Sequence, residues 1–211
     1  MQNDELLRTV EEQKTFETYK VYASKYAARG DDPLFWQYDI GLLARMLPRN
    51  SKVIDLGCGT GRDAPLLIEK GLQYFGVDFS QEMLAEARKS CPDALFREMD
   101  LYRLTIADSV FDGFWAAASY LHLPKHKLSV ALQEVRRILK PDGRGVFVML
   151  EGEGEAMFGG RSGGSERFYA KYSEIEFTRR LQDMDFVVNR VTKDTRLEGM
   201  VWLLFWVEVK K

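Results

Sequence analysis

Short apolar runs alternate along the chain with segments in which apolar residues recur every three or four positions. The runs lie at 52–56, 73–77, 94–98, 111–116 and 145–150. Several of them are apolar on consecutive residues, as expected of strands that are covered on both faces. Helical spacing is found between them at 62–70, 81–90 and 127–139. This alternation predicts an α/β domain with a mostly parallel sheet.

Two of the predicted helices have local signals at their ends. Ser80 precedes the helix over 81–90, and its hydroxyl is expected to cap that helix. Pro141, Asp142 and Gly143 are expected to end the helix over 127–139 and to turn the chain into the next strand.

Both ends of the chain add elements to this core. Helices are predicted at 5–29, 33–47 and 173–182, and strands at 186–192 and 200–209. Because no helix separates the last two strands, we expect them to form an antiparallel hairpin at one edge of the sheet. Residues 151–166 hold six of the chain's 17 glycines and are expected to form a mobile loop.

The elements together predict one Rossmann-like α/β domain over residues 1–211. Its seven-stranded sheet is mostly parallel with an antiparallel last strand, and helices cover both faces. The expected parts are N-terminal helices over a cofactor site (1–50), a cofactor-binding core (51–150), the glycine-rich loop (151–166) and a C-terminal helix with the hairpin (167–211).

Composition excludes several classes of protein. Hydrophobic residues make up 45% of the chain, and 13 Phe, 9 Tyr and 4 Trp supply a core, which excludes a disordered chain. The net charge of -2 lacks the basic excess that nucleic-acid binding needs. The longest apolar run, residues 200–207, is far below the roughly 20 residues that span a bilayer. Two separated cysteines and a polar, acidic start predict a cytoplasmic protein.

The strand at 52–56 runs directly into a glycine-rich turn and then a helix. Gly57, Gly59 and Gly61 stand at every second position, and such a turn lets the backbone approach a ligand closely. A dinucleotide-binding fingerprint instead spaces its glycines G-x-G-x-x-G. Arg62 stands where that third glycine would be. The turn therefore does not favour binding of a pyrophosphate.

Three acidic residues follow the ends of successive predicted strands: Asp55, Asp78 and Asp100. Ligands of open α/β sheets bind at these carboxyl ends, where an acid can accept hydrogen bonds from both hydroxyls of a ribose. We assign that role to Asp78, and Asp100 is placed to accept from the exocyclic amine of an adenine. The pattern predicts an adenosine-containing ligand, and the acidic rim also suits a positively charged one.

On these residues the chain resembles the class I S-adenosylmethionine (AdoMet)-dependent methyltransferases. The resemblance lies in five blocks that follow the order found in the family, at 53–63, 76–80, 99–101, 111–123 and 134–147. In the last block Asp142 stands where the family usually has a second glycine, a difference that concerns only a turn.

The resemblance implies AdoMet as the cofactor and assigns roles to individual residues. The implied pocket comprises Tyr19, Tyr26, Asp55, Gly57, Gly59, Gly61, Asp78, Phe79, Met83, Asp100, Leu101 and Ala116. In it the glycine turn would shape the site for the amino acid moiety, and Asp78 would hold the ribose. Phe79 and Met83 would line the adenine side, and Ala116 would present its carbonyl to the cofactor's ammonium. Tyr19 and Tyr26 would lie on a helix that closes over the cofactor.

His122 is the candidate catalytic residue. In-line methyl transfer depends mainly on alignment, and a base is needed only if the acceptor arrives protonated. His122 follows the fourth predicted strand, and its ordinary pKa suits a base, although the residue could equally just order this turn. Pro124 interrupts the spacing of His122 and His126 and no third ligand is evident, so no metal site is predicted.

The glycine-rich loop at 151–166 is expected to be either an active-site lid or a long connection without a role. Arg161 and Arg167 lie in it or just beyond it. An arginine there would hold the carboxylate of an acceptor that carries one, and otherwise would be an ordinary solvated charge.

The predicted function is AdoMet-dependent methylation of a small-molecule acceptor, with no nucleic acid or membrane as partner. Residues 115–118 read Trp-Ala-Ala-Ala, unlike the Asn/Asp-Pro-Pro-aromatic sequence of amino-directed DNA methyltransferases. Two alternatives stay open. One is an AdoMet-binding protein without catalytic activity, and the other is a nicotinamide-dependent oxidoreductase, against which the glycine spacing and Asp100 argue. The sequence does not predict the oligomeric state.

Overall fold

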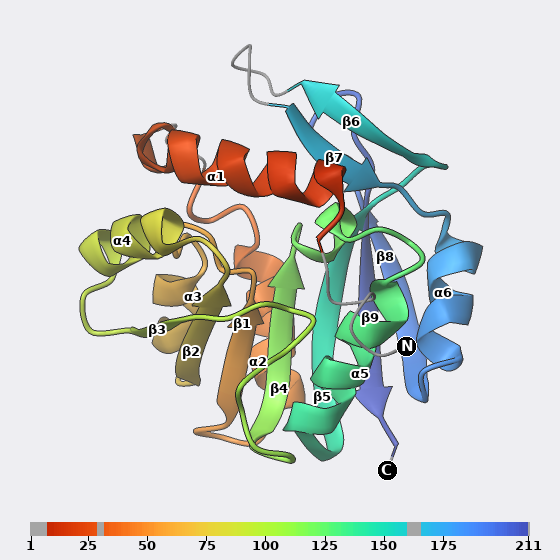
Figure 1. The fold of residues 1–211 in the computed structure, drawn as a ribbon. Coiled ribbons are helices and arrows are strands. Elements are labelled where there is room, and N and C mark those ends of the chain that lie inside the picture. The colour runs from red at the N-terminus through yellow and green to blue at the C-terminus, as the bar shows by residue number, and fades with distance from the viewer. Residues whose placement is uncertain (1–7, 29–31, 160–165, 211) are drawn as a thin grey trace.

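The computed structural model describes residues 8–28, 32–159 and 166–210, and its centre is a seven-stranded sheet (Figure 1). The strands are β1 (Lys52–Leu56), β2 (Gln73–Asp78), β3 (Leu95–Glu98), β4 (Phe111–Ala117), β5 (Leu139–Leu150), β8 (Phe186–Asp194) and β9 (Trp202–Val209). Their order is β3-β2-β1-β4-β5-β9-β8, and β9 runs antiparallel to the other six strands. The predicted Rossmann-like sheet and its edge hairpin are confirmed. The strand order reverses between β1 and β4, and a ligand site is expected at such a point.

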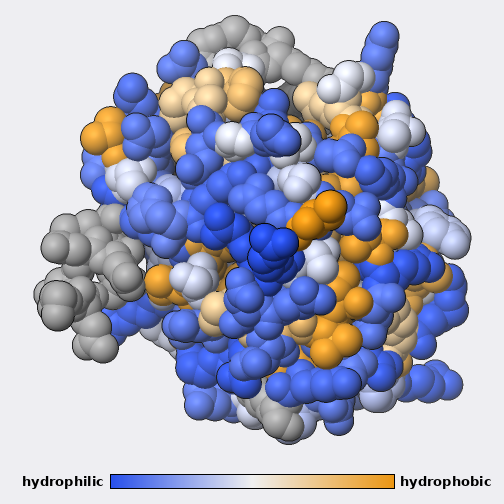
Figure 2. Space-filling model, turned by 90° about the vertical axis from the view of Figure 1, so that its right-hand side faces the viewer, coloured by the Kyte–Doolittle hydropathy of each residue, from blue (hydrophilic) through white to orange (hydrophobic). Residues whose placement is uncertain are grey.

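Helices cover both faces of this sheet. They are α2 (Gln37–Met46), α3 (Ala64–Glu69) and α4 (Gln81–Ser90) on one face, and α5 (Leu128–Ile138) and α6 (Glu174–Gln182) on the other. The expected cap of α4 is present, because the Ser80 hydroxyl accepts from the Met83 amide at 3.2 Å. The face that carries α6 is largely hydrophilic, with apolar residues in small groups (Figure 2). None of the helices in the described ranges is long and apolar enough to cross a membrane.

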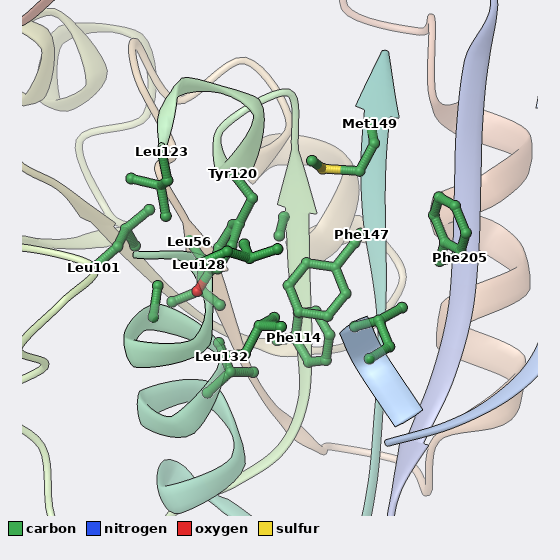
Figure 3. Close-up of a cluster of buried hydrophobic side chains, with 14 of the residues drawn as sticks. Leu56, Leu101, Phe114, Tyr120, Leu123, Leu128, Leu132, Phe147, Met149 and Phe205 are labelled. Atoms are coloured by element: carbon green, nitrogen blue, oxygen red, sulfur yellow. The ribbon is translucent and has the colours of Figure 1, made fainter. Parts of the chain in front are cut away.

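The consecutive apolar residues of the strands supply two cores. Val53 and Trp115 point into the core beneath α2, α3 and α4, whereas Ile54 and Phe114 point into the core beneath α5 and α6. Figure 3 shows this second core, in which Leu128 and Leu132 of α5 face the rings of β4 and β5. The central strands β1 and β4 are thus buried on both sides, as their sequence predicts.

Three predicted boundaries differ from the structure by more than two residues. The helix expected at 33–47 begins at Gln37, because residues 33–36 form a turn. Pro141–Gly143 do not precede β5 but lie within it, where the pairing with β4 is irregular and Asp142 has a φ of 60°. The helix over 5–29 is α1 (Val10–Ala28); residues 1–7 and 29 lie outside the described residues.

The expected mobile loop at 151–166 contains part of a hairpin. β6 (Glu155–Gly159) pairs antiparallel with β7 (Glu166–Ala170), with Phe158 opposite Arg167. Residues 160–165, which include the candidate Arg161, lie outside the described residues. The glycine content concealed the short strand-forming segment at 155–158, whose backbone groups are paired by β7.

The helix α1 lies across the carboxyl ends of the central strands (Figure 1). Polar residues on its inner side attach it to the rest of the protein. Glu12 and Lys127 form an ion pair at 2.8 Å with both side chains less than 8% exposed, and the Tyr102 hydroxyl donates to Glu12 at 2.7 Å. The Phe168 amide of β7 donates to the Thr15 hydroxyl at 2.8 Å. The position of α1 therefore depends on directed polar contacts.

The packing of β5 against β4 requires a glycine at position 145. A Cβ added to Gly145 would lie 2.2 Å from the Phe114 ring. We predict that Gly145→Ala lowers the free energy of unfolding by about 2 kcal/mol, the usual size of overpacking in a core. Urea denaturation measures the change. Gly159→Ala is the control, because a Cβ there meets none of the described residues within 4 Å. Equal effects of the two substitutions would contradict the packing account.

Candidate functional site

A cavity of about 350 Å³ lies between α1 and the carboxyl ends of β1, β2 and β4. Its walls come from α1, from the turn after β1, from the residues that follow β2 and β3, and from the segment after β4. It therefore occupies the point at which the strand order reverses, where parallel sheets bind their ligands.

The turn after β1 forms one wall of the cavity. The amides of Gly57 and Cys58 both donate to the Val77 carbonyl, at 2.8 and 2.9 Å. Gly57 has a φ of 75°, and a Cβ on it would lie 2.4 Å from the Cβ of Ser119. Only glycine permits this conformation together with so close an approach to the end of β4. Burial raises the pKa of the Cys58 thiol, which keeps it protonated and a poor nucleophile.

Gly61 belongs to the same turn but does not line the cavity. A Cβ on Gly61 would lie 3.0 Å from the Cβ of Ala87 and 3.1 Å from the Phe96 ring. This glycine therefore lets α4 pack against the back of the turn. The implied role of Gly61 in the pocket becomes one of support, whereas Gly57 and Gly59 do line the cavity.

Asp78 ends β2 with both carboxylate oxygens held by backbone amides. Gly59 donates to Oδ2 at 2.9 Å and Ser80 donates to Oδ1 at 3.0 Å. The side chain lines the cavity and is buried. Burial raises the pKa of Asp78 to about 6, against the opposing effect of these hydrogen bonds. The carboxylate is thus fixed in orientation and ionised at neutral pH.

A second acidic group lies behind the turn. The Tyr74 hydroxyl donates to Asp55 at 2.9 Å, and burial, followed by the nearby charge of Asp63, raises the pKa of Asp55 well above its usual range. Asp63 accepts from Arg62 at 2.7 Å and from the Trp115 indole at 2.9 Å. Arg62 and Asp63 both line the cavity, and neither is among the pocket residues that the family resemblance implies. Their position directly after the glycine turn is the feature of the sequence that could have identified them as cavity residues.

Four of the implied pocket residues line the end of the cavity near β2 and β3: Phe79, Met83, Asp100 and Leu101. Asp100 accepts from the Arg8 guanidinium at 2.9 Å and from the Tyr102 amide at 3.0 Å. Arg8 lies over the ring of Phe16, which in turn stacks on Phe79 with centroids 4.9 Å apart. This end therefore combines aromatic and apolar walls with a carboxyl group that accepts hydrogen bonds.

Tyr19, Tyr26 and His122 line the side of the cavity formed by α1 and by η1 (Tyr120–His122). The Tyr19 hydroxyl lies 2.7 Å from Nε2 of His122, and Nδ1 lies 2.6 Å from the Phe168 carbonyl. Because a carbonyl only accepts, Nδ1 carries the proton and Nε2 accepts from Tyr19. Burial lowers the pKa of His122 to about 3. The ring is therefore neutral, with its lone pair already engaged.

Ala116 does not line the cavity, contrary to the implied role. The strand β4 extends to Ala117, and the wall consists of Ala117, Ala118 and Ser119, while Ala116 is fully buried in the core. The predicted strand ended one residue too early, which placed the wall at the wrong alanine. In the described parts of the chain, no group of three or more His, Cys, Asp or Glu residues could hold a metal ion.

Comparisons with known proteins agree with this geometry. Residues 53–143 match the sequence model of a methyltransferase domain. Over 102 residues the chain is 36% identical to the putative methyltransferase YqeM of Bacillus subtilis, covering 46% of this chain and 41% of that protein. Over 90 residues it is 41% identical to an Escherichia coli trans-aconitate 2-methyltransferase, covering 41% of this chain and 35% of that protein. The chain thus spans less than half the length of these relatives.

A solved structure resembles the whole fold. It is a Burkholderia thailandensis 1,6-didemethyltoxoflavin-N1-methyltransferase with bound 1,6-didemethyltoxoflavin and S-adenosylhomocysteine. Its TM-score is 0.76 at 20% identity, and the match covers 97% of this chain and 92% of that one. The glycine turn, the acids at the strand ends, the strand order and these matches agree, and over residues 53–143 the chain is similar to methyltransferase domains.

Proposed function

We propose that this chain transfers a methyl group from AdoMet to a small-molecule acceptor. The observation that carries the proposal is the buried carboxylate of Asp78, held by the amides of Gly59 and Ser80 at the edge of the cavity. AdoMet supplies a sulfonium-bound methyl group that a nucleophile can displace. The residues of the chain then have to bind the cofactor, align the acceptor and exclude water.

The residues around the cavity fit an adenosine-containing cofactor. Asp78 accepts hydrogen bonds from the ribose hydroxyls, and Asp100 accepts from the adenine amine. Phe79, Met83 and Leu101 supply apolar surface for the adenine ring.

The amino acid moiety of the cofactor is assigned to the opposite side of the glycine turn. Gly57 and Gly59 present backbone there, beside the buried Asp55. Arg62, fixed in place by Asp63, supplies a positive charge for the carboxylate of this moiety. The wall at 117–119 takes the role that the sequence analysis gave to the carbonyl of Ala116.

The role proposed for His122 is to position Tyr19. Its Nε2 accepts from the Tyr19 hydroxyl, and a pKa of about 3 makes it a weak base. The neutral ring holds that hydroxyl at the wall of the cavity. Deprotonation of the acceptor by His122, the role considered from sequence, is therefore not part of this proposal.

The enclosed position of the cavity supports a small acceptor. The helix α1 and the hairpin of β6 and β7 lie above the strand ends, so an extended polymer would have to displace them (Figure 1). The net charge of -2 also offers little attraction to a polyanion. The names of the Escherichia coli and Burkholderia proteins specify small acceptors for those enzymes.

Calorimetric titration with AdoMet and S-adenosylhomocysteine tests the proposal. We expect the unaltered protein to bind both compounds. Asp78→Ala should weaken binding by roughly 100-fold, because two hydrogen bonds to a charged group are lost. Asp93→Ala, which alters an exposed acid away from the cavity, is the control. Failure of the folded, unaltered protein to bind either compound would contradict the proposed function.

The raised pKa of Asp78 predicts a pH dependence of binding. Below its pKa of about 6 the protonated group no longer accepts from both ribose hydroxyls, so affinity for S-adenosylhomocysteine should decrease as the pH falls. The decrease should approach roughly tenfold per pH unit. Affinity should be constant above about pH 7, well above that pKa. His122, with a pKa of about 3, does not titrate in this range. Calorimetry between pH 5 and 7.5 measures the dependence, and pH-independent binding across it would contradict the assignment.

Loss of the fold does not explain such a decrease. The pKa of Asp78 in the folded protein exceeds the ordinary value of 3.8, so protonating Asp78 favours the folded state as the pH falls. Asp78→Asn is the matched control, because the amide does not titrate, so any pH dependence that this variant keeps belongs to another group such as Asp55, whose pKa is also raised.

A further inference from the structure

The guanidinium of Arg167 lies among three tyrosine rings beside the cavity. Its Cζ is 5.7 Å from the ring centre of Tyr19 and 5.4 Å from those of Tyr26 and Tyr169. Nη1 donates to the Tyr19 hydroxyl at 3.3 Å. Tyr19 and Tyr26 line the cavity, and Arg167 of β7, which is not itself a lining residue, contacts both of them at its edge.

Arg167 differs from the other cations near the cavity in having no acidic partner among the described residues. The others form the ion pairs Arg8–Asp100, Arg62–Asp63 and Lys127–Glu12. Nε of Arg167 is buried and has no hydrogen-bond partner in the described part of the chain. A partly buried charge without a counterion is costly, and an anion bound next to it removes that cost.

The neighbouring tyrosine does not act as the counterion. Burial raises the pKa of Tyr19, so its hydroxyl stays protonated. That hydroxyl already donates to Nε2 of His122. Arg167 therefore faces neutral rings and neutral hydrogen-bonding groups, and its own side chain stays partly exposed.

Among the described residues, this side of the cavity offers no free base, because Glu12, which also lines it, is paired with Lys127. His122 is neutral and engaged, and the acids at the strand ends are assigned to the cofactor. An acceptor that is already an anion at neutral pH needs no deprotonation, and a carboxylic acid, with an ordinary pKa near 4, meets this condition.

We propose that Arg167 binds a carboxylate of the methyl acceptor, so that the acceptor is a small carboxylic acid bound as its anion. The planar guanidinium matches the two oxygens of a carboxylate, and the rings of Tyr26 and Tyr169 hold it in place. This inference rests on the proposed function, because it concerns the acceptor of the methyl group, whose carboxylate would reach Arg167 at the edge of the cavity.

The test is calorimetric titration of the protein after saturation with S-adenosylhomocysteine. The probes are acetate, benzoate, succinate and citrate, each compared with its amide. We expect at least one acid to bind, with its amide weaker by roughly tenfold or more. Arg167→Gln should weaken the acid by a similar factor and leave S-adenosylhomocysteine binding unchanged. Arg179→Gln, on the exposed surface of α6, is the matched control and should change neither.

Three results would overturn the inference. In the first, none of the acids binds the saturated protein, and in the second, an acid and its amide bind equally. In the third, Arg167→Gln weakens binding of the acid and of S-adenosylhomocysteine alike, as expected if Arg167 only supports Tyr19. Arg167→Lys keeps the charge without the planar fork and replaces Arg167→Gln if that variant does not fold. Absence of S-adenosylhomocysteine binding, which is measured first, would instead contradict the proposed function.

Discussion

The site depends on the close approach of the turn after β1 to the end of β4. Gly57 sits so near Ser119 that a Cβ would lie 2.4 Å from the serine Cβ, and its φ of 75° disfavours other residues. The Ser119 hydroxyl closes the contact by donating to the Leu56 carbonyl at 2.6 Å. With the turn in this place, the Gly59 amide reaches Asp78. One steric constraint thus sets both the wall of the cavity and the orientation of its most important acid.

The cavity is covered by a helix whose inner face is polar. Glu12 and Thr15 are buried in α1, and both contact groups on other elements, namely Lys127, Tyr102 and the backbone of β7. Hydrogen bonds of this kind contribute about 1 kcal/mol each, and more when one group is charged. They fix the position of α1 without an apolar stripe, and they place Tyr19 against His122. The cofactor end and the acceptor end of the cavity therefore share this helix as a common wall.

Much of the fold could be predicted from the sequence. The strands that are buried on both faces and the amphipathic helices have local patterns, and their alternation leaves few sheet topologies. The acids at the strand ends were recognisable for the same reason, because the end of a strand is a local feature. Asp78 and Asp100 therefore both line the cavity as expected.

What the sequence did not reveal depends on contacts between distant residues. Lys127 pairs with a residue 115 positions earlier, and Arg8 with one 92 positions later, and no local pattern predicts such partners. The pairing of β6 with β7 was concealed by the glycines around it. Gly61 shares its spacing with Gly57 and Gly59, yet only the packing of α4 distinguishes its role from theirs.

Hydrogen–deuterium exchange with and without S-adenosylhomocysteine tests most directly whether the cavity beneath α1 is the cofactor site. The geometry predicts slower exchange on addition of the compound in the turn after β1, in residues 78–83 and 99–102, and along α1. Protection confined to other segments, or none at a saturating concentration, would contradict the account.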